Sequence, residues 1–329
     1  DLTNKGEAVI KDSTINSMTA SNENKFELTA TPVESLALTN NSKDTTSIHD
    51  TTVNSMTASN DGELTLNSVT GNKMELTSKG NVEVNSSKIA NINSTISGNA
   101  VIDNLESTNM TSAVSGKSSI SNSSIANYDL TNTGESVIKD SAVTAMTAAN
   151  SGSLELTTTP VEKLDLNNKS NGKAQIHDTT VSSMTAANDG KLEANNFNGD
   201  KVGLTGAGNT NISDSNIKNI DANVSGNTEI SHLTNNQMTF ANSGVINISE
   251  SSSDNFDLTN TGETNVANSE VKNLNATNDG KLDLNAVTGS KYDLTSKGNV
   301  NINDSKIANI NSTISGNAVI DNLESTNMT

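Results

Sequence analysis

The chain has 329 residues, with 20 Lys, 38 Asp or Glu and no Arg, Cys or Trp, so its formal net charge is −18. The absence of cysteine excludes disulfides and thiolate metal sites, no apolar run is long enough to span a membrane, and a negative chain without arginine is a poor partner for nucleic acid. Only 31% of the residues are hydrophobic, whereas 54 are Asn, 45 Ser and 41 Thr, which is too little apolar material for a conventional core. Disorder and a repeat architecture remain as alternatives.

Internal repetition distinguishes these two alternatives. From Thr3 onward the sequence divides without remainder into 18 units, which we call coils 1–18 and number internally by position. Sixteen coils are built on 18 residues, the last one residue short, and two, 39–58 and 167–186, have 20 residues. We therefore predict one continuous repeat region over residues 1–329. The coils start at residues 3, 21, 39, 59, 77, 95, 113, 131, 149, 167, 187, 205, 223, 241, 259, 277, 295 and 313.

Glycine dominates one column of the aligned coils. Position 4 is glycine in 16 of the 18 coils, and Asn24 and Asp44 occupy it in the other two. After glycine, asparagine and aspartate best tolerate a left-handed backbone. The column therefore predicts a turn with positive φ at position 4 of every coil. The glycines are Gly6, Gly62, Gly80, Gly98, Gly116, Gly134, Gly152, Gly172, Gly190, Gly208, Gly226, Gly244, Gly262, Gly280, Gly298 and Gly316.

Two further columns are apolar and predict a core. Position 8 is a branched aliphatic residue in 17 of 18 coils, with Ala194 as the exception, and position 16 never holds a charged or small residue. Methionine at such a position is ordinarily gap filling, and disorder does not produce such columns. All eight methionines lie at position 16, namely Met18, Met56, Met74, Met110, Met146, Met184, Met238 and Met328, and the six aromatic residues lie at inward positions, namely Phe26, Tyr128, Phe197, Phe240, Phe256 and Tyr292.

A third buried site is filled from either of two neighbouring positions. Position 13 is usually Ile or Val, but where it is small or polar, as at Gly71 and Ser107, position 11 becomes apolar, as at Val69 and Leu105. This maintenance of volume indicates a packed interior. Coil 14 has serine at both positions, Ser251 and Ser253, and we expect it to be the loosest coil.

The spacing of the apolar residues predicts the fold. Within a coil they are spaced by two, which is typical of short strands with alternating faces, here of ~4–5 residues. The recurrence of the same columns predicts parallel stacking at ~4.8 Å per coil, and hence a rod of ~85 Å. The expected fold is all-β, a single parallel β-solenoid of 18 coils, in which Asn and hydroxyl residues in register form side-chain ladders. The two extra residues of each 20-residue coil precede position 4 and predict bulged turns.

The coils themselves belong to a longer repeat of seven coils. The segment Val9–Ala20 returns with few changes as Val137–Ala148, and Thr95–Thr111 recurs unchanged as Thr313–Thr329. The chain thus contains about two and a half tandem copies of this cassette, the last lacking two coils. Such near-identity indicates recent duplication, and we expect the chain to be a fragment of a longer repetitive protein.

These Asn/Ser/Thr-rich coils without Cys or Trp, with an N-x-G turn and an L-x-L or V-x-I strand, resemble a known class of protein. They are similar to the repetitive β-solenoid stalks of large bacterial exoproteins, such as filamentous-haemagglutinin-like two-partner-secreted adhesins and autotransporter passengers. The resemblance covers the whole chain. It implies a protein that is exported unfolded, folds outside the cell and holds a binding tip away from the surface.

No constellation of residues predicts catalysis or a bound cofactor. His49 and His177 occupy equivalent outward positions seven coils apart, ~34 Å, and His232 is separate from both, so we interpret all three as solvated surface residues. The aspartates of position 10 lie on non-adjacent coils and form no ladder of metal ligands. We predict no catalytic, cofactor-binding or metal-ligating residue, and at most a weak association with Ca²⁺. The position-10 aspartates are Asp12, Asp50, Asp140, Asp178, Asp214 and Asp304, and the Asn-Asp-Gly turns contain Asp61, Asp189 and Asp279.

These observations predict a structural protein and not an enzyme. The first hypothesis is a stalk segment of an adhesin-type exoprotein, secreted or on the bacterial cell surface, and the alternative is a subunit of an extracellular filament joined end to end. Ice binding is a weaker alternative because outward Thr never occupies positions 17 and 1 together in the coils compared, and a polysaccharide-acting β-helix lacks a groove with a polar cluster. The expected partners are neighbouring repeats or further copies of the chain, with host-cell or matrix contacts made by other domains and none with nucleic acid.

Overall fold

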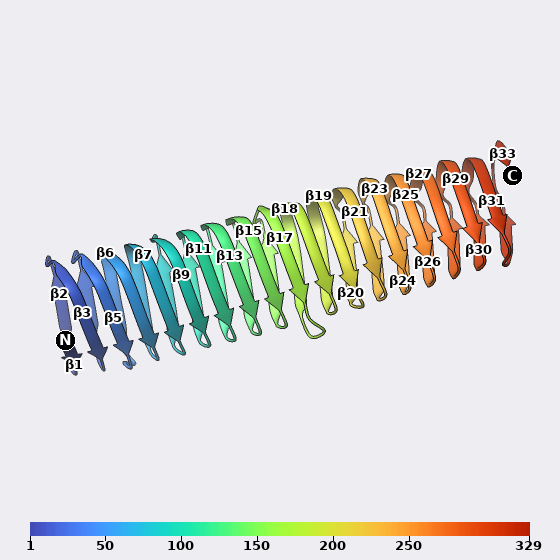
Figure 1. Ribbon diagram of the computed structural model, residues 1–329. Coiled ribbons are helices and arrows are strands. Elements are labelled where there is room, and N and C mark those ends of the chain that lie inside the picture. Colours follow the sequence, from blue (N-terminus) through green and yellow to red (C-terminus); the bar gives the residue numbers. More distant parts are fainter. The chain divides into compact units, whose positions relative to one another are not determined.

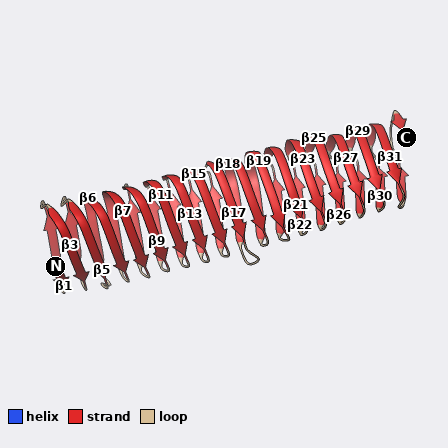
Figure 2. Cartoon of the chain, viewed as in Figure 1, coloured by secondary structure: helices blue, strands red, loops and turns tan.

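The computed structural model describes residues 1–329 and contains only strands, turns and bends (Figures 1 and 2). Its 33 strands form about 18 turns of a parallel β-solenoid, so the predicted fold class is confirmed. The chain divides into two compact units, the N-terminal unit over residues 1–162 and the C-terminal unit over residues 163–329. Each unit is described by itself below.

Each coil consists of a short strand and a longer one. In coil 5 the short strand is β8 (Asn81–Asn85), and the long strand β9 (Lys88–Ile96) follows after two residues. Burial alternates along both strands, except that Ala90 and Asn91 both face outward in β9. Two successive outward residues bend the long strand and turn the chain around the core. The long strands therefore exceed the ~4–5 residues expected from the sequence, because pairing continues through this bend, whereas short strands such as β8 have the expected length.

The N-terminal unit contains seven short strands, six long strands in addition to the brief β1, and two strands that run through a whole coil. The short strands are β2 (Ala8–Lys11), β4 (Phe26–Thr29), β8, β10 (Asn99–Asp103), β12 (Lys117–Ser121), β14 (Glu135–Lys139) and β16 (Ser153–Thr157); the others are β1 (Leu2–Asn4), β3 (Ile15–Asn22), β5 (Val33–Asn40), β6 (Thr45–Asn60), β7 (Glu63–Ser78), β9, β11 (Glu106–Val114), β13 (Ser124–Asn132) and β15 (Ala142–Asn150).

The C-terminal unit repeats this pattern, and the division between the units falls within β17 (Val161–Asn168). The short strands are β20 (Asn209–Ser213), β22 (Asn227–Ser231), β24 (Val245–Ser249), β26 (Glu263–Ala267), β28 (Lys281–Asn285), β30 (Asn299–Asn303) and β32 (Ala318–Asp321); the others are β18 (Lys173–Asn188), β19 (Lys191–Gly206), β21 (Asn216–Val224), β23 (Thr234–Asn242), β25 (Ser252–Asn260), β27 (Glu270–Asn278), β29 (Thr288–Ser296), β31 (Lys306–Ile314) and β33 (Asn327–Met328).

Within each unit, a residue pairs with its equivalent in the next coil. Ile102 of β10 lies opposite Ile120 of β12, and Ile230 of β22 lies opposite Ile248 of β24, always in parallel. The columns predicted to be apolar are therefore rows in the core. Position 8 is buried from Leu28 onward, and position 16 is buried from Met18 onward, whereas their last members, Ile320 and Met328, are 37% and 50% exposed. All six aromatic side chains are buried, as predicted.

The glycine column has a different cause from the one that we predicted. None of the position-4 glycines has a positive φ, nor do Asn24 and Asp44; the one glycine with a positive φ is Gly206, which lies elsewhere in its coil. A Cβ at Gly116 would instead come closer than 3.0 Å to the carbonyl oxygen of Gly98, one coil earlier. Side chains are absent here because successive backbones approach too closely to leave room for one.

The left-handed corner lies at position 10. All 18 residues of this column have φ between 47° and 53°, and 11 of them are Asp or Asn. These two residue types tolerate the left-handed region better than other non-glycine residues. The aspartates that we weighed as metal ligands are therefore explained by backbone geometry.

Position 11, just inside this corner, is filled in one of two ways. Where it is serine, as at Ser123, the hydroxyl donates to the carbonyl of Ser121 at 2.7 Å and accepts from the backbone N–H of Leu105 at 3.0 Å. Where it is apolar, the side chain fills the corner directly, as Phe197 does beside Gly199. The predicted exchange of volume between positions 11 and 13 is confirmed, and the hydrogen bonds explain why serine is the usual small residue.

The extra residues of the two 20-residue coils lie in turns, as predicted. They fall between β5 and β6, at residues 41–44, and between β17 and β18, at residues 169–172. In the second turn the N–H of Gly172 donates to the carbonyl of Lys169 at 2.8 Å. The apolar columns stay in register before and after each turn, because the added residues lie outside the paired strands.

Candidate functional site

The most extensive polar feature is an asparagine ladder inside the coils, at position 2. Asn4 donates to the side-chain oxygen of Asn22 at 2.7 Å, and Asn22 donates to that of Asn40 at 3.1 Å. The same amides donate to backbone carbonyls at the next turn, such as that of Lys25. We predicted side-chain ladders, but not that position 2 faces the interior. The inward positions 16 and 18 of one coil are followed, two residues later, by position 2 of the next coil. The alternation of strand faces would therefore have shown that position 2 faces inward.

His49 lies at the centre of a cluster of polar side chains on coils 2 and 3. Its Nδ1 lies 3.1 Å from Asp50 Oδ2, and its Nε2 lies 2.7 Å from Thr29 Oγ1 and 3.3 Å from Glu27 Oε1. The hydrogen bond to Asp50 and the contact with Glu27 raise the pKa of His49. The hydrogen bonds from His49 and Thr29 lower the pKa of Glu27. This geometry favours a charged imidazole between two carboxylates.

A second histidine, His232, is less isolated than the sequence suggested. It lies in the position-10 column between Asp214 and Glu250, with its Nδ1 3.5 Å from Asp214 Oδ1 and its Nε2 2.8 Å from Glu250 Oε2. We considered only the aspartates of this column and so missed Glu250. His177 lies 3.4 Å from Gln175 through its Nε2. Although His49 and His232 each lie between two carboxylates, neither of these groups, nor any other in the structure, has three His, Cys, Asp or Glu side chains arranged to hold a metal ion.

Several aspartates of position 10 accept hydrogen bonds from the next coil. Asn196 donates to Asp178 at 2.7 Å, and Asn322 donates to Asp304 at 2.6 Å. Thr158 donates to Asp140 at 2.5 Å. Each of these bonds joins residues one coil apart at the left-handed corner, so these carboxylates contribute to the stacking of the coils.

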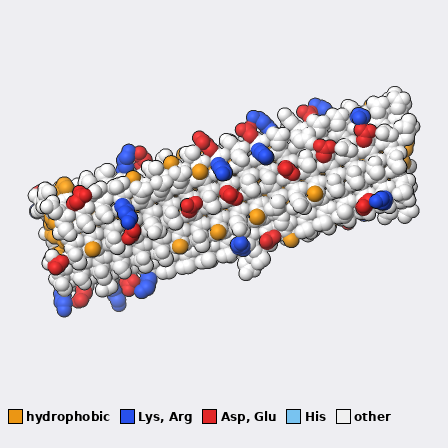
Figure 3. Space-filling view, in the orientation of Figure 1, with side chains coloured by type: hydrophobic (Ala, Val, Ile, Leu, Met, Phe, Trp, Pro, Cys, Tyr) orange, Lys and Arg blue, Asp and Glu red, His pale blue; other side chains and the backbone are white.

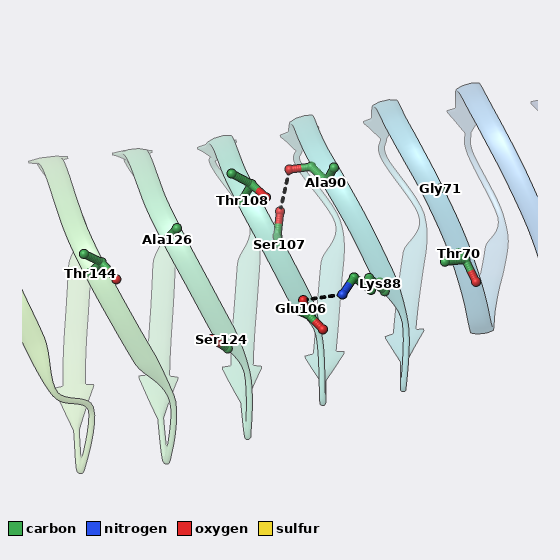
Figure 4. Close-up of a pocket in the computed structure, with 10 residues that line it drawn as sticks. All are labelled: Thr70, Gly71, Lys88, Ala90, Glu106, Ser107, Thr108, Ser124, Ala126 and Thr144. Atoms are coloured by element: carbon green, nitrogen blue, oxygen red, sulfur yellow. Dashed lines mark hydrogen bonds and ion pairs between the residues drawn. The ribbon is translucent and has the colours of Figure 1, made fainter.

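A hollow in the N-terminal unit lies along the outer side of the long strands (Figure 4). Its volume is about 300 Å³. Small side chains at positions 13 and 14, such as Gly71 and Ala90, leave the space, while Lys88 and Glu106 form one wall and pair at 2.5 Å. The lining residues are Thr70, Gly71, Lys88, Ala90, Glu106, Ser107, Thr108, Ser124, Ala126 and Thr144.

The polar side chains of this hollow form hydrogen bonds and one ion pair. The hydroxyl of Ser107 is turned inward and donates to the carbonyl of Ala90 at 3.3 Å (Figure 4). Lys88 and Glu106 form an ion pair across one wall of the hollow. A smaller hollow of about 150 Å³ lies at the equivalent place seven coils later, over Gly199, where Lys218 pairs with Asp200 at 2.5 Å.

The outer surface is polar and its charges are dispersed. Figure 3 shows one face on which acidic and basic side chains are scattered among uncharged polar ones, with few apolar atoms between them. Lysines commonly pair with an acid one coil away, as Lys117 does with Glu135 at 2.9 Å. The tyrosines are inside, where burial raises the pKa of Tyr128 to about 12. The exposed rows therefore offer amides, hydroxyls and paired charges.

The comparisons with known proteins give no relative. No protein-family model matches the chain, and neither a curated protein nor a solved structure matches it. The resemblance to adhesin stalks thus rests on the motifs of the coils alone. The chain contains no helix of the length and apolarity needed to cross a membrane.

Proposed function

We propose that this chain is a structural stalk segment of an adhesin-type exoprotein, located outside the cell or on the bacterial surface. In this role it is not an enzyme and uses no cofactor. Its mechanism is mechanical, since stacked backbone hydrogen bonds provide length and stiffness. Host-cell, surface or matrix contacts are then made by other domains of the same protein.

The observation that carries this proposal is the uniformity of the coils within each unit. Before the last coil no connection between strands is longer than four residues, so no elaborated loop rises above the surface. Binding and catalytic residues are most often presented by such loops. A regular stack with a hydrated, acidic exterior suits a spacer that stays soluble and adheres to little.

Electron microscopy of the purified chain over a range of concentrations tests this proposal. A stalk segment should give single elongated particles whose length does not change with concentration. Compact or featureless particles would contradict the structural role altogether. Flanking the chain with two globular marker proteins provides the control, because a stiff spacer holds the markers at one fixed separation.

The alternative function, a subunit of an extracellular filament, predicts a different result in the same experiment. Copies joined end to end would give long unbranched fibres that lengthen with concentration, with an axial repeat of ~4.8 Å. Their appearance would replace the stalk proposal with the filament.

Calcium binding is a separate question, raised by the net charge of −18. We propose that Ca²⁺ associates only weakly, through the general field of the acidic surface. Calcium chloride should then raise the melting temperature no more than sodium chloride of equal ionic strength. A clear excess for calcium, abolished by a chelator, would show a specific site.

A further inference from the structure

Coils 13 and 14 contain the least satisfied part of the core. Asn235, at position 13 of coil 13, is 3% exposed, and neither its Nδ2 nor its Oδ1 has a hydrogen-bond partner. Thr228 of the same coil is 1% exposed and its Oγ1 is also unpaired. A buried polar group without a partner loses its hydration and gains nothing in return.

Other coils solve the same packing problem without this defect. The equivalent residue of coil 6, seven coils earlier, is Ser107, whose hydroxyl donates to the carbonyls of Ala90 and Asn109, each at 3.3 Å. Coils 11 and 16 have Gly199 and Gly289, which carry no polar side chain at all. Asn235 is therefore the exception among the coils that have an apolar residue at position 11.

The next coil adds a second weakness at the same place. Asn235 lies opposite Ser253 in the pairing of β23 with β25. Ser251 and Ser253 are 7% and 1% exposed, so two buried serines occupy the corner where the equivalent coil 7 has Ile125 at position 13. This corner therefore combines an unpaired side-chain amide with reduced apolar burial.

The other side of the same two coils is well held. The rings of Phe240 and Phe256 pack edge to face with centroids 5.9 Å apart and an interplanar angle of 82°. Aromatic pairs of this geometry add stabilisation beyond their buried area. The weakness is therefore local to the corner and does not extend around the coil.

We infer that the corner formed by Leu233, Asn235, Ser251 and Ser253 is a built-in breakpoint at which the C-terminal unit opens before its other interior coils. The Phe240–Phe256 pair keeps the two coils joined while the corner opens. Proteins open locally where buried contacts and hydrogen bonds are fewest. Under tension or protease attack the unit yields here first. This inference is independent of the stalk proposal, because it concerns local stability in any context.

Hydrogen exchange on the full-length chain tests the breakpoint, with coils 6 and 7 as the internal control. The backbone N–H groups of residues 234–237 and 252–255 should exchange about tenfold faster than those of residues 106–109 and 124–127. This factor is what one unpaired, buried side-chain amide is expected to cost in local stability. Equal rates in the two regions would overturn the inference.

Two substitutions copied from the control coils test the cause. Asn235→Ser introduces the residue of coil 6, and Ser253→Ile introduces that of coil 7, so both are already accommodated by this fold. Together they should slow exchange at residues 234–237 about tenfold. A rate unchanged in each variant, with circular dichroism like that of the parent chain, would show that Asn235 and Ser253 are not the cause.

Discussion

The side chain of Asn242 donates a hydrogen bond to the side chain of Asn260 over 2.9 Å, and both amides are buried inside the C-terminal unit. Asn260 in turn donates to Asn278 at 2.7 Å and to the carbonyl of Lys281 at 2.8 Å. Each amide thus links its own coil to the next one by side-chain and backbone acceptors together. Polar residues in the core are in this way part of the stacking interaction.

Removing one amide from this ladder should destabilise the unit. Asn260→Ala leaves the buried side-chain oxygen of Asn278 and the half-buried carbonyls of Gly262 and Lys281 without that donor, and we expect a loss of about 2 kcal/mol in the free energy of unfolding measured with urea. The control is Asn273→Ala in the same coil, whose exposed side chain donates to Asn255 at 3.1 Å. That change should cost less than about 0.5 kcal/mol. Equal effects would contradict the role of the interior ladder.

The glycine column should be sensitive to a single methyl group. Gly116→Ala places a Cβ against the carbonyl oxygen of Gly98, and we expect a loss of about 1–3 kcal/mol from the overpacking. Gly6→Ala is the matched control, because no atom lies within 4 Å of its added Cβ. Comparison of the melting temperatures of the two variants distinguishes the two possible reasons for glycine at position 4, namely close approach of the preceding backbone and the conformational freedom of glycine. If Gly6→Ala were as harmful as Gly116→Ala, crowding would not be the reason for glycine.

A charge at position 16 should disrupt the core. Met184 is 1% exposed, so Met184→Asp buries an unpaired carboxylate and should cost about 4 kcal/mol or more. Thr185→Asp, one residue later, faces solvent at a position where Asp165 occurs naturally in the preceding coil. Circular dichroism and melting of the second variant should match those of the parent chain. A Met184→Asp protein that melted like the parent would show that the inward register is wrong.

The His49 cluster should make stability depend on pH. Because the pKa of His49 is raised in the folded state, its contribution is present below about pH 6.5 and is lost as the pH rises through the folded value. Because the pKa of Glu27 is lowered, its contribution is present above about pH 4.5 and is lost on further acidification. The difference in urea midpoint between the parent chain and His49→Gln should be greater at pH 5.5 than at pH 8.5.

An NMR titration checks the same cluster directly. In Glu27→Gln the pKa of His49 should fall towards its usual value, because one of its two carboxylate partners is removed. Glu83→Gln is the control, since Glu83 interacts with Asn85 and not with the histidine. An unchanged titration of His49 in Glu27→Gln would exclude the contact.

The rise per coil can be measured within the N-terminal unit. The chain has no cysteine, so pairs of introduced cysteines can be spin-labelled without background. Thr3→Cys with Thr131→Cys spans seven coils and should give ~34 Å, whereas Thr39→Cys with Thr131→Cys spans five and should give ~24 Å. Distances from pulsed electron paramagnetic resonance that did not differ by about two strand spacings would contradict the parallel stack.

The core could be predicted from the sequence because of the symmetry of the fold. In a parallel stack every member of a column has the same environment, so 18 copies of one position report the same requirement. The burial of positions 8 and 16, from Leu28 to Ile302 and from Met18 to Ile310, follows from composition alone. The exchange of volume between Val69 and Gly71 was visible for the same reason.

The roles of glycine, aspartate and asparagine could not be assigned with equal success. Glycine occurs where φ is positive and also where backbones approach closely, and a column of glycines does not distinguish the two causes. The excess of Asp and Asn at position 10 was a usable signal for the left-handed corner, but we examined it only for metal binding. Asn235 looks like any other small or polar residue at position 13 until its lack of partners is seen.

The sequence by itself therefore determined the repeat length, the inward columns and the parallel β-solenoid, because periodicity and apolar spacing are properties of the chain that need no coordinates. Only the tertiary structure decided which corner is left-handed, why Gly116 has no side chain and which amides are paired. Those features depend on distances between atoms of successive coils, 18 or 20 residues apart in sequence but in contact in space. The residue type limits the interactions that a side chain can make, and the contacts with the neighbouring coil determine which of those interactions form.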